Sequence, residues 1–169
     1  MIGFYNYTVV LTYIGLVSSL CGIYLSMNGR HVTAAVILLM ISGLCDMFDG
    51  KIARTRKRTE NEKRFGIQID SLCDLICFGL LPCAIGYSIG MNKIYHVAVL
   101  VFFTLAAVIR LAYFNVMEEN RQKVTAENRR EYEGLPVTSV ALILPLFYSF
   151  KKDMGSLFPE IYMILLLTV

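Results

Sequence analysis

The sequence has no tryptophan, only two histidines and few charged residues. Charged side chains make up 17% of its 169 residues, whereas soluble domains carry about a quarter. No CxxC pair occurs among its five cysteines, which are Cys21, Cys45, Cys73, Cys77 and Cys83. Their odd number and their spacing fit neither a disulfide framework nor a zinc site, so we interpret them as packing residues. These absences argue against a soluble domain and against a zinc protein.

Long apolar runs dominate the chain, which is 56% hydrophobic with a mean hydropathy of +0.59. A helix of about 20 apolar residues crosses the hydrocarbon core of a bilayer. Apolar segments occupy residues 7–27, 32–50, 67–90, 94–117 and 134–150, and a sixth begins near Phe158. The sequence therefore predicts an all-α integral membrane bundle of six transmembrane helices in a single domain, residues 1–169. We expect the sixth helix to be truncated at Val169, because too few residues remain for it to span.

Positive charge predicts how the bundle is oriented. Residues 51–65 contain seven Lys and Arg and residues 118–133 contain four, out of 16 in the chain. Such an excess marks the cytoplasmic side of a membrane protein. The first apolar stretch has no basic leader and no cleavage pattern, so we interpret it as a retained helix. We expect a multi-pass protein of the cell membrane with both basic stretches in the cytoplasm, surrounded by lipid bilayer and without a nucleic-acid partner.

Four aspartates flank the first basic stretch. Asp46 and Asp49 end the second segment, and Asp70 and Asp74 lie near the start of the third. Residues three or four apart share a helix face, so a helical hairpin can bring all four carboxylates together. Carboxylates at a membrane boundary are costly and repel one another, and a divalent cation offsets both effects. Oxygen ligands suit Mg²⁺, Mn²⁺ or Ca²⁺ better than zinc, so the pattern predicts a site for a hard divalent metal.

Small residues lie one helical turn from two of the aspartates. Gly50 lies one turn beyond Asp46, and Gly66 lies one turn before Asp70. Small side chains leave room for a ligand, although close packing between helices requires them equally. Together with the four aspartates and Arg54, we interpret them as part of a pocket.

The stretch from Asp46 to Asp74 resembles the signature of the CDP-alcohol phosphotransferase family, DxxDGxxAR…GxxxDxxxD, with every signature residue present. The resemblance implies that Asp46, Asp49 and Asp70 are metal ligands. It also implies that Asp74 contributes a ligand oxygen and acts as the general base. The expected cofactor is Mg²⁺ or Mn²⁺, as two ions, and the expected assembly is a homodimer.

The resemblance further implies a pocket for a CDP-linked lipid. Its expected contacts are Gly50, Ala53, Arg54, Gly66, Lys63, Thr8 and Thr12. The sequence departs from the family pattern in three places. Eleven residues separate Arg54 from Gly66, which is longer and more basic than usual, and Lys63 stands where a Ser or Thr is common. Val9 replaces a polar residue expected three positions before Thr12, and the neighbouring Thr8 is its candidate substitute.

Two further stretches point to the acceptor of the transfer. RLAYFN at residues 110–115 and GLPVTS at residues 134–139 resemble stretches of the phosphatidylserine synthase branch, with Tyr113 in place of an arginine. The branch implies transfer from CDP-diacylglycerol to L-serine. The candidate acceptor contacts are Arg110, Asn115 and Thr138. Structural alternatives are snorkelling for the arginine and capping or interhelical hydrogen bonding for the other two.

Two other functions stay open on the sequence alone. A sister transferase would use glycerol 3-phosphate or inositol phosphate, and such anionic acceptors would favour further cations beside the aspartates. A cation or proton transporter would also place carboxylates in a membrane. Transport sites tend to lie near the midplane on broken helices in repeated halves. Here the aspartates border a loop, and no inverted repeat is evident.

Overall fold

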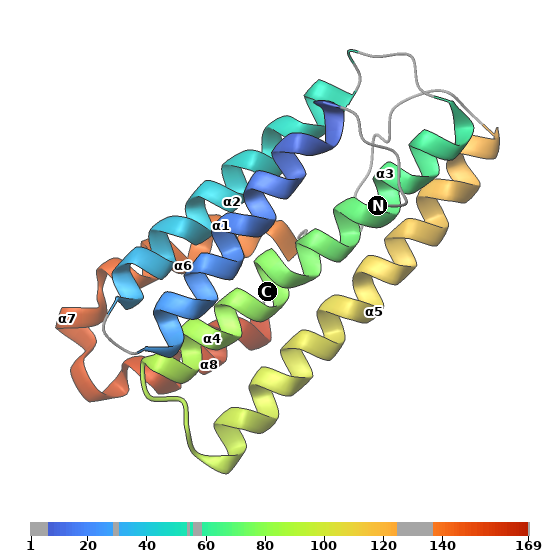
Figure 1. Cartoon of the computed structure of the whole chain (residues 1–169). Coiled ribbons are helices and arrows are strands. Elements are labelled where there is room, and N and C mark those ends of the chain that lie inside the picture. Colours follow the sequence, from blue (N-terminus) through green and yellow to red (C-terminus); the bar gives the residue numbers. More distant parts are fainter. Residues whose placement is uncertain (1–6, 29–30, 54, 56–58, 125–136, 169) are drawn as a thin grey trace.

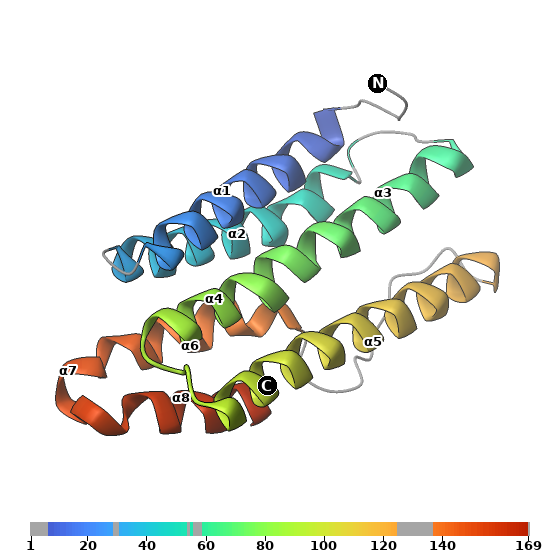
Figure 2. The same cartoon turned by 60° about the horizontal axis from the view of Figure 1, so that its bottom comes forward.

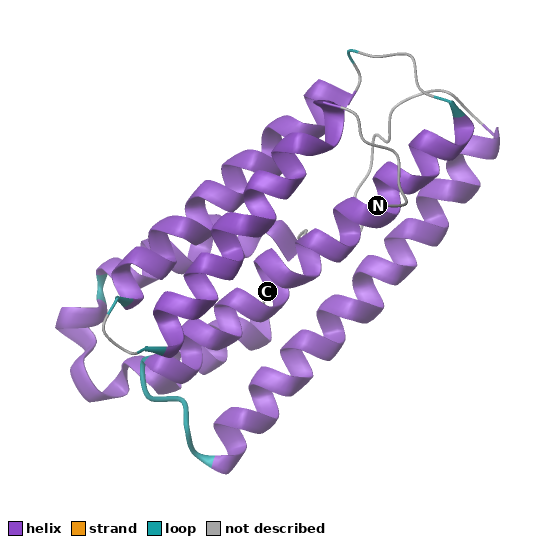
Figure 3. Cartoon of the chain, in the orientation of Figure 1, coloured by secondary structure: helices purple, strands orange, loops and turns teal. Residues whose placement is uncertain are grey.

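A computed structural model of the chain consists of helices that run along a common direction (Figures 1 and 3). The structure describes residues 7–28, 31–53, 55, 59–124 and 137–168, without the side chains of Thr8, Ala53 and residues 121–124. Within these ranges there is no β-strand. The predicted all-α membrane bundle is confirmed.

Four helical stretches are long and apolar enough to cross a membrane. They are α1 (Val10–Met27), which follows a short 3₁₀ turn (Tyr7–Val9); α2 (Val32–Ala53); the continuous rod α3 (Glu60–Asp74), η2 (Leu75–Leu80) and α4 (Leu81–Ser88); and α5 (Ile94–Val124). Figure 2 shows this rod between the α1–α2 pair and α5, and the rod contacts each of these neighbours.

The remaining helices are shorter. They are η3 (Val137–Ser139), α6 (Val140–Ser149), α7 (Lys151–Met154), η4 (Gly155–Leu157) and α8 (Phe158–Thr168). Of the expected segment 134–150, residues 134–136 lie outside the described part, and the described apolar helix covers 137–149. Of the six expected spanning helices, four therefore reach spanning length within the described residues.

The rod begins earlier than the apolar pattern predicts, at Glu60 rather than near residue 67. Thr59 caps α3: its backbone N–H donates to the Glu62 carboxylate at 2.8 Å, and its hydroxyl accepts the Glu62 N–H at 3.3 Å. This reciprocal capping box makes the polar first turns of α3 helical. The apolar pattern shows only the part of a helix that is suited to lipid, so it missed these two turns.

The buried face of α1 carries only small side chains, namely Thr12, Gly15, Ser19, Gly22 and Ser26. Large apolar residues of the same helix, such as Val17 and Tyr24, are exposed. Small residues let membrane helices approach closely, and a Cβ atom at Gly22 would lie 3.0 Å from the Leu81 side chain. The polar edge of α1 therefore faces α2 and the rod.

Polar contacts at the end of the bundle away from the aspartates hold α8 in place. Lys93 Nζ donates to the Tyr95 hydroxyl at 2.8 Å, and that hydroxyl donates to Glu160 at 2.8 Å. The hydrogen bonds to Tyr95 and Glu160 raise the pKa of Lys93. Deeper in the bundle, the Tyr162 hydroxyl donates to the Pro82 carbonyl at 2.8 Å. These contacts attach α8 to both α5 and α4.

Gly43 sets the spacing between α2 and α6. A Cβ atom at Gly43 would lie 2.6 Å from Cβ of Ala141. Both atoms are fixed to helix backbones, so Gly43→Val forces the helices apart, and overpacking of this kind costs about 1–3 kcal/mol. We expect a lower unfolding temperature in detergent, measured by circular dichroism. Leu44→Val, at an exposed neighbouring position, is the control and should leave the unfolding temperature unchanged. Equal unfolding temperatures for the two variants would contradict a tight contact at Gly43.

Candidate functional site

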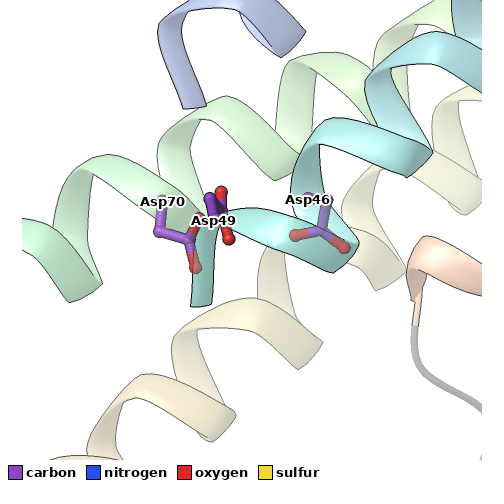
Figure 4. Close-up of side chains that lie close together, drawn as sticks. All are labelled: Asp46, Asp49 and Asp70. Carbon is purple, nitrogen blue, oxygen red and sulfur yellow. The ribbon is translucent and has the colours of Figure 1, made fainter. Parts of the chain in front are cut away.

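Three of the four aspartates meet between the C-terminal turns of α2 and the second half of α3. Figure 4 shows Asp46 and Asp49 on α2 and Asp70 on α3, gathered between the two helices. One carboxylate oxygen from each lies within 4.8 Å of the others. The antiparallel arrangement of α2 and α3 therefore brings together two pairs that are separated by a loop in the sequence.

Asp74 joins the group from the next turn of α3. It lines one small cavity together with Asp46 and Asp49, and Asp49 in turn converges with Asp70. Asp74 is not among the three residues whose oxygens converge most closely in the described part of the chain. All four carboxylates thus form one cluster, which we call the aspartate cluster, with Asp74 one helical turn farther from the start of α3 than Asp70.

Helix α1 contributes a hydroxyl to the aspartate cluster. Thr12 Oγ1 donates to Oδ2 of Asp49 at 3.0 Å, and both residues are buried. A small cavity beside this hydrogen bond is lined by residues of α1, α2 and the rod, including Asp74, Ser42 and Cys73. Thr12 was predicted to contact the CDP-linked lipid, and the structure places its hydroxyl on a metal-ligand candidate.

A π-helical turn, η2, follows Asp74 directly. It contains the wide hydrogen bond from the Leu81 N–H to the Ile76 carbonyl, and it carries the buried Phe78. Single π-helical turns inside α-helices are frequent at functional sites. This turn joins the aspartate-bearing α3 to α4 in one continuous rod. The sequence carries no known signal for such a turn, and it was not predicted.

The aspartate cluster lacks compensating positive charge from the described residues. Within the described ranges, no salt bridge joins any of the four carboxylates to a basic side chain. Buried charges without partners are strongly unfavourable. The convergent donors are all carboxylate oxygens, which Mg²⁺, Mn²⁺ and Ca²⁺ prefer, and they are close enough for one cation to contact three of them. The residues present therefore fit a hard divalent cation.

The residues expected to contact the CDP-linked lipid surround the cluster only in part. Gly50 is exposed, and a Cβ atom there would have no neighbour within 4 Å. Gly66 lies one turn before Asp70 on α3, and Lys63 is exposed near the start of that helix. Gly50 thus borders open space, as a ligand pocket requires. The other expected contacts fall where the structure describes no side chain: Ala53, Arg54 and Thr8.

Two of the three candidate acceptor contacts lie on α5 opposite the rod. The Ser71 hydroxyl donates to Oδ1 of Asn115 at 2.6 Å, which leaves the Asn115 amide hydrogens free of that bond. Ser71 immediately follows Asp70, so Asn115 lies beside the aspartate-bearing helix. Ser71 was not predicted, although its hydroxyl next to a signature aspartate could have suggested a role.

Arg110 presents an unsatisfied donor. One terminal nitrogen of its guanidinium is buried and has no hydrogen-bond partner among the described residues, and the group lies 5.6 Å from the centre of the Phe114 ring. Buried polar groups normally have partners. Thr138, the third candidate, is half-buried in η3, which packs against η2.

A family model, described as CDP-alcohol phosphatidyltransferase, matches residues 5–169. The chain belongs to the CDP-alcohol phosphatidyltransferase family. The assignment predicted from the residues between Asp46 and Asp74 is therefore confirmed. No solved structure matches the chain.

Relatives in this family carry names that specify serine. The CDP-diacylglycerol–serine O-phosphatidyltransferase of Saccharomyces cerevisiae is 36% identical over 127 residues, which cover 73% of this chain and 45% of the yeast protein. The archaetidylserine synthase of Methanothermobacter thermautotrophicus is 31% identical over 144 residues, 83% of this chain and 58% of that protein. A Helicobacter pylori CDP-diacylglycerol–serine O-phosphatidyltransferase is 33% identical over 112 residues, 64% of this chain and 43% of that protein. The matches thus span about half the length of these relatives.

Proposed function

We propose that this chain transfers a phosphatidyl group from CDP-diacylglycerol to the hydroxyl of L-serine, giving phosphatidylserine and CMP. The observation that carries the proposal is the convergence of three signature aspartates, Asp46, Asp49 and Asp70, between α2 and α3. The names of the relatives, two serine phosphatidyltransferases and an archaetidylserine synthase, favour serine as the acceptor. The exposed apolar helices provide the lipid-facing surface that such a substrate requires.

Asp46, Asp49 and Asp70 would hold Mg²⁺ or Mn²⁺, with Asp74 adding an oxygen, and four carboxylates offer enough ligand atoms for two ions. Such ions, when bound, neutralise charge on the diphosphate and on the departing CMP. The chain contributes the fixed positions of the carboxylates. Helical spacing sets each pair, and the packing of α2 against the rod sets the distance between the pairs.

The bond changes follow from the chemistry of phosphoryl transfer. The serine hydroxyl oxygen attacks the phosphorus that carries diacylglycerol, a new P–O bond forms, and the P–O bond to CMP breaks. The hydroxyl proton passes to the Asp74 carboxylate, which acts as general base. Asp74 suits this role because it lines the cavity beside the cluster and is the carboxylate outside the close group of three.

The pocket for the CDP moiety lies on the solvent side of the aspartate cluster in this proposal. Gly50 and Gly66 leave room beside the carboxylates, and Lys63 supplies a cation near the start of α3. Ala53, Arg54 and Thr8 stay proposed contacts on the strength of the family resemblance. The site faces the cytoplasm of a cell membrane in this proposal. The basic stretch 51–65 lies in the sequence between the two aspartate pairs, and basic stretches mark the cytoplasmic side. A homodimer is the assembly that the family resemblance implies.

Serine would bind between the rod and α5. A carboxylate is the natural partner for the unsatisfied nitrogen of Arg110, since a guanidinium binds carboxylates through paired hydrogen bonds. The Asn115 amide keeps two donor hydrogens that the bond from Ser71 does not use, and these would bind an oxygen of the acceptor. Thr138, on η3, would complete the contacts. A zwitterion with a hydroxyl fits these groups.

A panel of acceptors tests the proposed reaction. The purified chain, with Mn²⁺ and CDP-diacylglycerol in mixed micelles, is supplied with L-serine, L-alanine, glycerol 3-phosphate or inositol phosphate, and CMP release is followed. We expect release to depend on L-serine. L-alanine is the matched control, because it lacks only the attacking hydroxyl, and should leave release at background. Turnover with a phosphorylated acceptor and none with serine would overturn the serine assignment.

A further inference from the structure

We propose that Thr12 is a positioning residue of the metal site, which holds Asp49 in the orientation that faces Asp46 and Asp70. The inference rests on the proposed function, and it assigns to α1 a role that the aspartate signature of α2 and α3 does not contain. The contact involves a hydroxyl from one helix and a carboxylate from another, 37 residues apart in the chain.

The contact is buried on both sides. Thr12 is 8% exposed and Asp49 is 7% exposed, whereas Asp46 and Asp70 are half-buried. Asp49 lies centrally, because its oxygen belongs to the convergent group of three and Figure 4 shows it between Asp70 and Asp46. A hydroxyl that fixes Asp49 therefore acts on the middle of the cluster.

A donated hydrogen bond has two effects on a carboxylate ligand. It satisfies one oxygen, Oδ2 of Asp49, and it limits rotation about the side-chain bonds. Without it, the buried carboxylate would face three like-charged neighbours with fewer constraints on its direction. Outer partners that orient metal ligands typically contribute about 10–100-fold to metal affinity.

The position of α1 makes this contact rigid. The face of α1 that carries Thr12 continues through Gly15 to Ser19, and a Cβ atom at Gly15 would lie 3.3 Å from that of Cys45 on α2. The close approach of the two backbones leaves Thr12 little room to move away from Asp49. The small residues of α1 thereby fix the geometry of the site, in addition to packing the bundle.

If Thr12 instead contacted the CDP-linked lipid directly, its substitution would have a different effect. The single hydroxyl hydrogen of Thr12 is donated to Asp49, and the residue is nearly inaccessible to solvent. A lipid contact would change the KM for CDP-diacylglycerol and leave metal binding intact. If Thr12 positions Asp49, its substitution weakens metal binding even when no lipid substrate is present.

The test measures Mn²⁺ binding to the purified chain without CDP-diacylglycerol, from the electron paramagnetic resonance signal of free Mn²⁺. Thr12→Val and Thr12→Ala both remove the donor, the first at nearly constant volume and the second without added bulk. Both should weaken Mn²⁺ binding by about 10-fold. Thr12→Ser keeps the donor and should stay within about twofold of the wild type. Ser19→Ala is the matched control, a buried hydroxyl on the same face two turns away, and should leave binding unchanged.

Turnover provides a second readout. The two donor-free variants should need more Mn²⁺ for half-maximal CMP release, approach the wild-type kcat when Mn²⁺ saturates, and keep the wild-type KM for CDP-diacylglycerol. Wild-type Mn²⁺ affinity in a folded Thr12→Val or Thr12→Ala chain would overturn the positioning role and leave the metal site intact. Absence of Mn²⁺ binding to the wild type would overturn the metal site itself, so the two failures are distinguishable.

Discussion

Asp74→Asn is expected to lower the rate of serine-dependent CMP release by about 10²–10⁴-fold, the range that a general base contributes. The amide has nearly the shape of the carboxylate but cannot accept the hydroxyl proton as the P–O bond forms. The three aspartates whose oxygens converge remain in place. Mn²⁺ binding and CDP-diacylglycerol binding should therefore be largely retained, so the loss should appear in kcat.

The control for this variant is Asp153→Asn, on α7 at the other end of the bundle and exposed. It should have wild-type turnover. Full activity of Asp74→Asn would remove Asp74 from the role of base. A loss of Mn²⁺ binding as large as the loss of turnover would instead assign Asp74 to the metal site alone.

Asp49→Ala is expected to have a still broader effect, because it removes the carboxylate at the centre of the cluster. Mn²⁺ affinity should fall by more than the roughly 10–100-fold that outer partners contribute, and CMP release should fall with it. Ala also leaves the Thr12 hydroxyl without its acceptor. Equilibrium binding of Mn²⁺ and CMP release are measured on the same preparation.

The metal-free stability of Asp49→Ala separates a functional from a structural role. Removing one carboxylate from a cluster of like charges relieves repulsion, so the unfolding temperature without metal should be equal to or above that of the wild type. Functional residues commonly carry such a cost in stability. A strongly lowered unfolding temperature would show that Asp49 supports the fold, and the loss of activity would then say nothing about metal.

The sequence predicted the membrane bundle and the meeting of the aspartates for a simple physical reason. The length of an apolar segment directly indicates whether it can form a membrane-spanning helix. Residues three or four apart share a helix face whatever the tertiary structure. Helical spacing places the carboxylates of each pair on one face, Asp46 with Asp49 and Asp70 with Asp74. Only the hairpin between α2 and α3 was then needed to bring the two pairs together. The limits of those helices were less predictable, because the start of α3 depends on the capping box at Thr59 and Glu62.

Contacts between distant segments were the part that the sequence could not supply. The hydrogen bonds from Thr12 to Asp49 and from Ser71 to Asn115 join residues 37 and 44 positions apart. Each depends on how two helices are rotated about their axes, and apolar periodicity is weak in a helix surrounded by lipid. The small residues on one face of α1 did carry a signal, because close helix packing in membranes favours them.

The site needs access to water for the nucleotide and an apolar surface for the acyl chains, and its place near the C-terminal end of α2 supplies both. The carboxylates need charged partners and access to a water-soluble nucleotide, and the acyl chains of the lipid need an apolar surface. The bundle offers both, since exposed apolar side chains such as Leu44 and Leu72 lie on the helices that carry the aspartates. A diphosphate joined to diacylglycerol would lie across this boundary.

Dependence of CMP release on divalent metal decides whether the aspartate cluster is a metal site. The chain is stripped with a chelator, returned to chelator-free buffer, and assayed with CDP-diacylglycerol and L-serine before and after Mg²⁺ or Mn²⁺ is added back. We expect background release from the stripped protein and recovery with either ion. Undiminished release in the presence of excess chelator would contradict a metal site.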